Sequence, residues 1–247
     1  MLKPLHIAAR PLSSLAEAQR RAAAFDLGAP VAIRVSPRTR RVLLRVDGAD
    51  RRIELVLPRG VAAERGLAFL DAQRDWIAVR LALLPQPVPF AEGAVVPVFG
   101  VPHRIRRETD PQAPPVWLAD GEIRVRGDPA HLPRRVRDYL MRLARAELGA
   151  RARRLARRIG KPVVRVTVRD TKSRWGSCSS GGCLSFSWRL VLAPADVVDY
   201  VVAHEVAHLV EMNHGPRFWR LVRELHPDSA AARAWLKRHR NRLFSYG

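Results

Sequence analysis

The sequence predicts an α+β fold in which a β-rich N-terminal region, residues 1–130, precedes a second region, residues 131–247. Short apolar segments bounded by turn residues dominate the first region, as is typical of strands. Apolar residues at helical spacing dominate much of the second region. A change of composition near Asp128-Pro129 separates the two. At about 150 residues per domain, a chain of 247 residues forms one large domain or two small ones.

The composition excludes several classes of protein. Apolar residues make up 47% and charged residues 27% of the chain, values typical of a globular protein rather than a disordered or fibrous one. No apolar stretch approaches the about 18 residues of a membrane span, and the first residues lack the apolar core of a signal peptide. Two cysteines, Cys178 and Cys183, are too few for a secreted disulfide scaffold. We therefore expect a cytoplasmic protein without a membrane partner.

The chain is strongly basic, with 44 Lys and Arg against 23 Asp and Glu and a net charge of +21. Only four of the basic residues are Lys, and a GC-rich genome would also produce such a bias toward Arg and Ala. The distribution of charge is more informative, since residues 1–130 contain 20 basic and 14 acidic groups while residues 131–247 contain 24 and 9. The second region therefore contributes most of the field that would attract a polyanion.

The first region alternates between strands and a helix. Apolar residues recur at close to helical spacing from Val61 to Leu84, which predicts one amphipathic helix that ends before Pro85. The three strands before this helix are separated by turn signals, and a meander is their simplest arrangement. The expected strands are residues 31–36, 41–46, 52–58, 94–100, 103–107 and 122–126.

Residues 132–159 predict one long basic helix or two shorter ones. Apolar residues keep approximate helical spacing, and ten Arg against only Asp138 and Glu147 occupy other positions. Two interpretations of the 134–158 segment stay open. It is a solvated surface face, or it is a contact surface for phosphate or an acidic partner, with non-specific nucleic acid as the possible ligand.

A strand at residues 163–169 precedes a hairpin candidate. If Ser180-Gly181 forms its tight turn, Cys178 faces Cys183 and Trp175 faces Phe186 as a cross-strand aromatic pair. The two cysteines are then reduced hairpin residues, a redox-sensitive pair or part of a metal site. Two thiols without further Cys or His ligands nearby favour the first interpretation.

The segment from Pro194 to Trp219 contains the residues that indicate chemistry. Pro194 suits the first turn of a helix, and His204 and His208 then leave the same helix face one turn apart, the spacing that two ligands of one ion need. Glu205 is rotated by about 100° from His204, which places it beside an ion rather than on it. Because apolar residues surround the motif, these polar side chains need a partner.

A third histidine, His214, follows six residues after His208. In an unbroken helix it would lie about 120° from the other two, so the helix has to stop, and Asn213, Gly215 and Pro216 are residue types that stop one. Three imidazoles with an open fourth position are typical of a catalytic zinc site. Phe218 and Trp219 in the next helix are expected to pack against this one and hold His214.

The pattern predicts a hydrolase. Zinc lowers the pKa of a bound water to about 7, and Glu205 accepts the proton as hydroxide attacks a carbonyl carbon and returns it to the leaving amine. The ion itself, Arg174 and Tyr200 are the candidates for stabilising the oxyanion. Tyr200 lies four residues before His204 and can share its face, but a Tyr in an apolar helix is also a common structural residue.

These motifs together resemble the metallopeptidase domain of the YgjP-like family, a relative of SprT-like zinc proteases. The resemblance is densest over residues 170–240 and consists of RWGSCS, the Trp-Arg-Leu segment, the Ala-Pro helix start, Tyr-Val-Val-x-His-Glu-x-x-His-Leu and Asn-His-x-x-x-Phe-Trp. It is weaker over the N-terminal β segments. Metzincins have the same spacing of the third His, but Glu211 stands where they have Gly, and no downstream Met-turn is evident.

The resemblance implies a zincin-like catalytic domain at residues 131–247, in which a small sheet packs on helices, and an accessory region at residues 1–130. It also implies a peptide or protein substrate. Zinc would be bound by His204, His208 and His214, and Glu205 would be the catalytic acid/base. Two alternatives stay open. A metal-dependent hydrolase of nucleotide phosphoanhydrides would use the same activated water. A nucleic-acid-associated protease of SprT type, or a binding module with structural zinc, would use the 134–158 segment without sequence preference.

Overall fold

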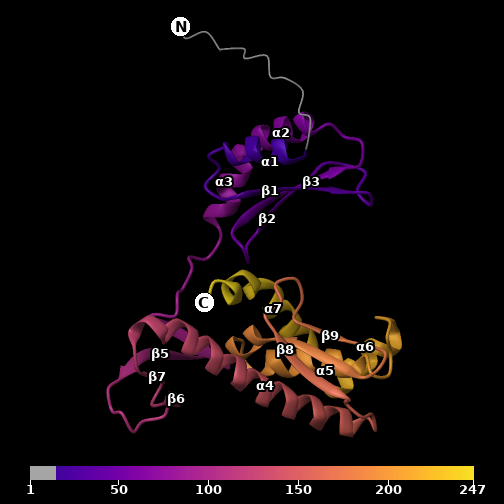
Figure 1. The fold of residues 1–247 in the computed structure, drawn as a ribbon. Coiled ribbons are helices and arrows are strands. Elements are labelled where there is room, and N and C mark those ends of the chain that lie inside the picture. The colour runs from indigo at the N-terminus through magenta and orange to yellow at the C-terminus, as the bar shows by residue number, and fades with distance from the viewer. Residues whose placement is uncertain (1–14) are drawn as a thin grey trace. The chain divides into compact units, whose positions relative to one another are not determined.

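The computed structural model describes residues 15–247, which divide into two compact units, one ending at Pro85 and one from Gln86 to Gly247 (Figure 1). Most of the N-terminal stretch that bears on an export signal lies outside the described residues. No helix within residues 15–247 is long and apolar enough to cross a bilayer.

The first unit contains a three-stranded sheet and three helices. Its elements are α1 (Leu15–Ala23), β1 (Val31–Ser36), β2 (Leu43–Asp47), β3 (Arg52–Pro58), α2 (Ala63–Ala72) and α3 (Arg74–Ala82). β3 lies in the centre, parallel to β1 and antiparallel to β2. The expected meander is therefore wrong. β3 carries the most buried residues of the three strands, and the central position is where a strand is covered best.

The predicted helix from Val61 to Leu84 is interrupted at Gln73. This residue has φ −105° and ψ 16°, which ends α2 and precedes α3. Leu70 of α2 and Ile77 of α3 are both fully buried in the same apolar core. Because both helices place their apolar residues in one core, the spacing of these residues does not reveal the break.

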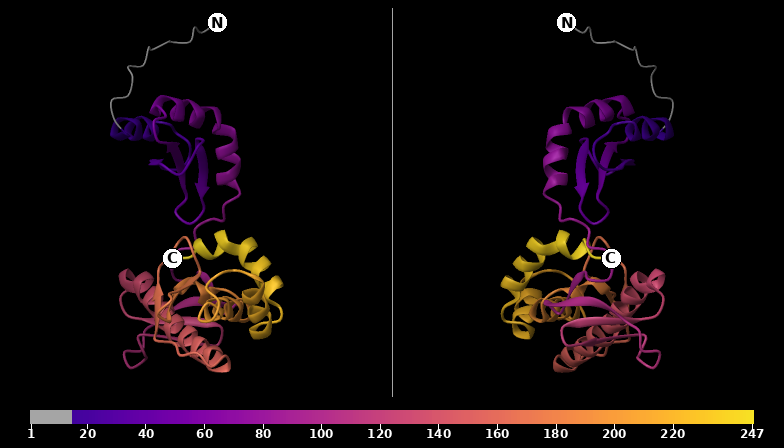
Figure 2. Two further views of the ribbon diagram at one scale, coloured as in Figure 1. Left: turned by 90° about the vertical axis from the view of Figure 1, so that its right-hand side faces the viewer. Right: turned by 90° about the vertical axis from the view of Figure 1, so that its left-hand side faces the viewer.

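The second unit contains two sheets and four α-helices. Its elements are β4 (Val95–Val98), β5 (Val101–Glu108), β6 (Val116–Ala119), β7 (Glu122–Arg126), α4 (Leu132–Arg158), β8 (Arg165–Arg169), β9 (Gly176–Cys178), β10 (Cys183–Ser187), α5 (Ala195–Ala207), α6 (Pro216–Leu225) and α7 (Ser229–Phe244), with 3-10 helices at Pro129–His131 and Trp188–Leu192. The sheet orders are β4-β5-β7-β6 and β8-β10-β9. In both figures α4 lies below and α7 above, with the second sheet and α5 between them (Figures 1 and 2).

The structure divides the chain at residues 85 and 86 rather than at the expected boundary of 130 and 131. The reason is that β4 to β7 share one core with the helices that follow. Ile105 and Ile123 of the first sheet belong to the same buried cluster as Leu140 of α4 and Trp188. The change in composition at Asp128 therefore marks the start of α4 inside a unit.

Residues 132–158 form one continuous helix, α4. Val136, Leu140 and Leu148 lie on its buried stripe, which faces the core of the unit. The helix ends in a Schellman motif, in which Gly160 with φ 64° donates to the carbonyl of Arg157 and Lys161 donates to that of Ala156. The chain then turns into β8.

β9 and β10 form the predicted hairpin, but the predicted register is wrong by one residue. Cys178 faces Leu184 and Gly176 faces Phe186. Ser179 pairs with Cys183 across a three-residue loop that ends at Gly182, whose φ is 74°. A left-handed glycine at the end of such a loop adds one residue to the turn, which shifts every cross-strand pair.

Candidate metal centre

α5 places the first two histidines. It begins after Pro194, and nine of its 13 residues are buried, including Val201 and Val206 on either side of His204. The helix ends at Ala207, so that His208 is its C-cap residue, with φ −66° and ψ −16°. The chain then turns away, as the backbone N–H of Glu211 donates to the carbonyl of Ala207 at 3.0 Å. The helix stops before the third histidine, as expected, but its last residue comes one position before His208.

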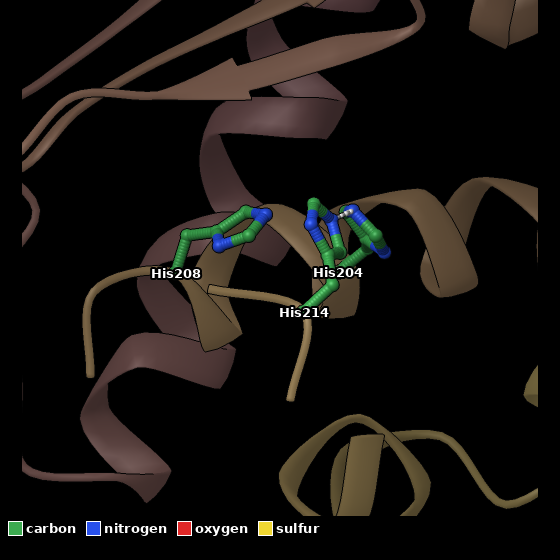
Figure 3. A group of neighbouring side chains, drawn as sticks. All are labelled: His204, His208 and His214. Carbon is green, nitrogen blue, oxygen red and sulfur yellow. Dashed lines mark hydrogen bonds between the residues drawn. The ribbon is translucent and has the colours of Figure 1, made fainter. Parts of the chain in front are cut away.

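The loop after α5 returns His214 to the first two histidines just before α6 begins at Pro216. Nitrogen atoms of His204, His208 and His214 all lie within 4.8 Å of one another. The Nε2 atoms of His204 and His214 are 3.1 Å apart, and His208 approaches them from the other side (Figure 3). Among the described residues this is the group of side chains arranged to hold a metal ion.

Two of the three rings, His204 and His208, suit a cation because their environment disfavours the protonated form. Burial, with added repulsion from His208, His214 and Arg233, lowers the pKa of His204 to about 4. Burial also lowers the pKa of His208, against an opposing hydrogen bond to Glu211. A neutral imidazole offers a lone pair, which a metal ion can accept.

His208 is oriented for binding by the backbone. Its Nδ1 lies 3.0 Å from the carbonyl oxygen of Glu211, and since a carbonyl only accepts, Nδ1 carries the proton. The lone pair is therefore on Nε2. A hydrogen bond from the other ring nitrogen is the usual way in which a protein fixes a metal-binding histidine.

Phe218 of α6 supports all three rings from one side. Its ring centroid lies 4.9 Å from that of His204, 4.5 Å from His208 and 4.7 Å from His214, and its side chain is fully buried. The ring centroid of Trp219 lies 5.8 Å from that of His204 and 5.9 Å from that of His214. The expected packing of Phe218 and Trp219 is confirmed.

Glu205 lies next to the histidines but outside their ligand group. It is only 6% exposed, and burial raises its pKa to about 7 against the opposing charge of Arg174. Gly176 of β9 forms the opposing wall, because a Cβ atom there would lie 2.5 Å from both Cγ and Oε1 of Glu205. The missing side chain at Gly176 is what makes room for the carboxyl group.

Arg174 and Tyr200 both reach this site. A cleft of about 230 Å³ is lined by Arg174, Trp175, Gly176, Tyr200, Val201, His204, Glu205 and Leu236. The Tyr200 ring is buried at 6.1 Å from that of His204, and burial raises the pKa of its hydroxyl. The two candidates for contacting a carbonyl oxygen therefore line the same cleft as His204 and Glu205.

Sequence reasoning missed Gly176 and Arg233. Arg233 of α7 lies 5.0 Å above the ring of Trp219, and its charge contributes to the low pKa of His204. Neither residue has a motif or a spacing relative to the histidines that would single it out. Their roles come from contacts between elements far apart in the chain.

The two cysteines lie outside the metal centre. Cys178 and Cys183 are free thiols and belong to no group of potential metal ligands within the described part of the chain. Burial is the main cause that raises the pKa of Cys178 to about 11. The thiol at Cys178 is therefore neutral near pH 7.

The basic 134–158 segment lies on α4. Arg151 donates to Asp199 at 2.7 Å and pairs with Glu147 at 3.4 Å, so part of its charge is used within the protein. Arg145 and Arg157 are among its exposed residues. Nucleic-acid binding by this helix stays a prediction.

Comparison with known proteins identifies the family of this chain. The family model described as YgjP-like, metallopeptidase domain, matches residues 40–239. No curated protein and no solved structure matches the chain. The matched residues cover most of the chain and include all three histidines and Glu205. The chain therefore belongs to the YgjP-like metallopeptidase family.

Proposed function

We propose that this metallopeptidase hydrolyses peptide bonds with zinc held by His204, His208 and His214 and with Glu205 as the general base. The observation that carries the proposal is the convergence of three imidazoles beside a buried carboxyl group. We also propose that residues 131–247 contain the zincin-like catalytic elements and that the chain acts in the cytoplasm, an expectation supported by its two free cysteines.

The donor set fits zinc. Three imidazole nitrogens within 4.8 Å of one another can meet a single ion, and three protein ligands leave a fourth tetrahedral position open. A bound zinc ion would supply Lewis acidity and lower the pKa of a water molecule to about 7.

Glu205 is suited to move the proton. A carboxyl group whose pKa is about 7 can accept a proton from water and release it to a leaving amine near neutral pH. Gly176 and the core around α5 hold the carboxyl group in one place. We propose that Arg174 or Tyr200 donates to the carbonyl oxygen of the substrate as negative charge develops there, since both line the cleft next to Glu205.

The test is cleavage of a peptide library by zinc-loaded protein, with new amino termini identified by mass spectrometry. Wild-type protein is expected to cleave, and Glu205→Gln is expected to keep the metal and lose turnover. Full activity in Glu205→Gln would refute the general-base role. Release of pyrophosphate from nucleoside triphosphates without peptide cleavage would refute the proposed reaction.

A further inference from the structure

A second depression lies directly beside the catalytic cleft, on the outer face of the β8-β10-β9 sheet. It has a volume of about 340 Å³, and we call it the arginine groove. The six residues that matter here are Arg165, Thr167, Arg169, Arg174, Ser177 and Ser185. Arg174 lines both the groove and the cleft that contains His204 and Glu205, so the two are adjacent.

Strand alternation explains why the groove is polar. Val168 and Phe186 point to the buried face of the sheet, so Thr167 and Ser185, their neighbours along β8 and β10, point to the opposite face. On that face Thr167 is paired with Ser185, which is paired with Ser177. This row of short hydroxyl side chains forms the floor.

Two arginines lie on β8, the strand that contributes Thr167 to this floor. Arg165 and Arg169 lie two residues on either side of Thr167, and both are exposed. Among the described residues neither forms a salt bridge with an acidic side chain. No acidic residue lines the groove. The groove therefore presents uncompensated positive charge, which suits carboxylate oxygen atoms. In the floor below, the Thr167 hydroxyl already donates to the carbonyl of Leu184 at 3.3 Å.

We propose that the arginine groove binds acidic side chains of the peptide substrate and thereby selects peptides with Asp or Glu on one side of the bond that is cleaved. This inference rests on the proposed peptidase function and adds the substrate class. Single-stranded nucleic acid is the less suitable ligand, because no aromatic ring lines the groove on which a base could stack.

Binding is the readout that does not depend on turnover. The full chain with Glu205→Gln, loaded with zinc, is titrated into a fluorescent peptide rich in Glu and into its counterpart with Gln at the same positions. An exposed ion pair contributes up to about fivefold in affinity, so two such pairs predict a preference of up to about 25-fold for the Glu peptide. Added salt is expected to reduce this preference.

Two variants of equal charge separate the groove from the general field of the protein. Arg165→Gln/Arg169→Gln is expected to abolish the preference and leave affinity for the Gln peptide unchanged. Arg145→Gln/Arg157→Gln changes exposed arginines on α4, removes the same charge and is expected to keep the preference. Arg165→Glu/Arg169→Glu is expected to favour a Lys-rich peptide instead, which guards against loss of folding as an explanation.

Equal affinity of the parent protein for the Glu and Gln peptides would overturn the proposal, as would a preference that survives Arg165→Gln/Arg169→Gln. An equal loss in both Gln variants would assign the effect to net charge and overturn it too. So would a single-stranded oligonucleotide that binds in the groove in place of the Glu peptide. If acidic peptides bind as expected but wild-type protein cleaves none, the groove stands and the peptidase proposal fails.

Discussion

Gly176 offers a sharp test of how the fold positions the proposed base. In Gly176→Ala the new methyl group would lie 2.5 Å from Cγ and Oε1 of Glu205 and 2.7 Å from its Cδ. Ordinary contacts between such atoms are about 3.5 Å, so the carboxyl group has to move by about 1 Å. Glu205 is only 6% exposed, which leaves it little room to do so without disturbing its neighbours.

The expected effect is on turnover more than on folding. A displacement of about 1 Å can reduce the rate by about 100-fold, and overpacking costs about 1–3 kcal/mol of stability. The assay is kcat/KM for a cleaved peptide, together with zinc content and melting temperature. Because Gly176 is not a ligand, zinc content is expected to stay at the wild-type level.

Gly181→Ala in the same hairpin is the matched control. A Cβ atom there would lie no closer than 4.0 Å to Oγ of Ser179, so wild-type activity is expected. Full activity in Gly176→Ala would show that the close approach to Glu205 has no bearing on catalysis. An equal loss in Gly181→Ala would assign the effect to the hairpin as a whole. Either result would contradict a role for Gly176 in positioning Glu205.

Three further predictions concern the metal centre. Glu205→Gln is expected to retain zinc and lose at least about 100-fold in kcat, whereas His204→Ala is expected to lose both zinc and activity. Elemental analysis and the peptide assay measure these two properties. Retained zinc in His204→Ala would contradict the prediction. Phe218→Ala removes the ring that supports all three histidines. It is expected to lower the free energy of unfolding by about 3–5 kcal/mol and to weaken zinc binding, as measured by denaturant unfolding and chelator competition. Unchanged stability and zinc affinity would contradict a supporting role for this ring. Arg174→Gln is expected to lower kcat about 10-fold to 100-fold with zinc content unchanged, and a rate equal to wild type would remove Arg174 from the reaction.

The local part of the site could be predicted from sequence because it depends on helix geometry. The spacing of His204 and His208 gives their common face, and the residues around His214 indicate that the helix stops first. The convergence of the three rings then follows from one short segment. The support from Phe218 is also local, since α6 begins soon after His214.

Other features depend on contacts between distant parts of the chain, which spacing does not encode. The contact between Gly176 and Glu205 joins β9 to α5. The hairpin register changed because Gly182 adopts a left-handed conformation, and a one-residue slip reverses the face of every side chain. The boundary at residue 85 reflects a core shared by β4 to β7 and α4, although composition changes at Asp128.

Metal content is the most direct test of the three-histidine site. Protein purified from cells grown with added zinc is analysed for bound metals, and the site is located in crystals by anomalous scattering at the zinc edge. We expect one zinc ion per chain, with an anomalous peak within bonding distance of His204, His208 and His214, and no peak there in His208→Ala. Folded, zinc-supplied protein that contains no ion among these rings would contradict it.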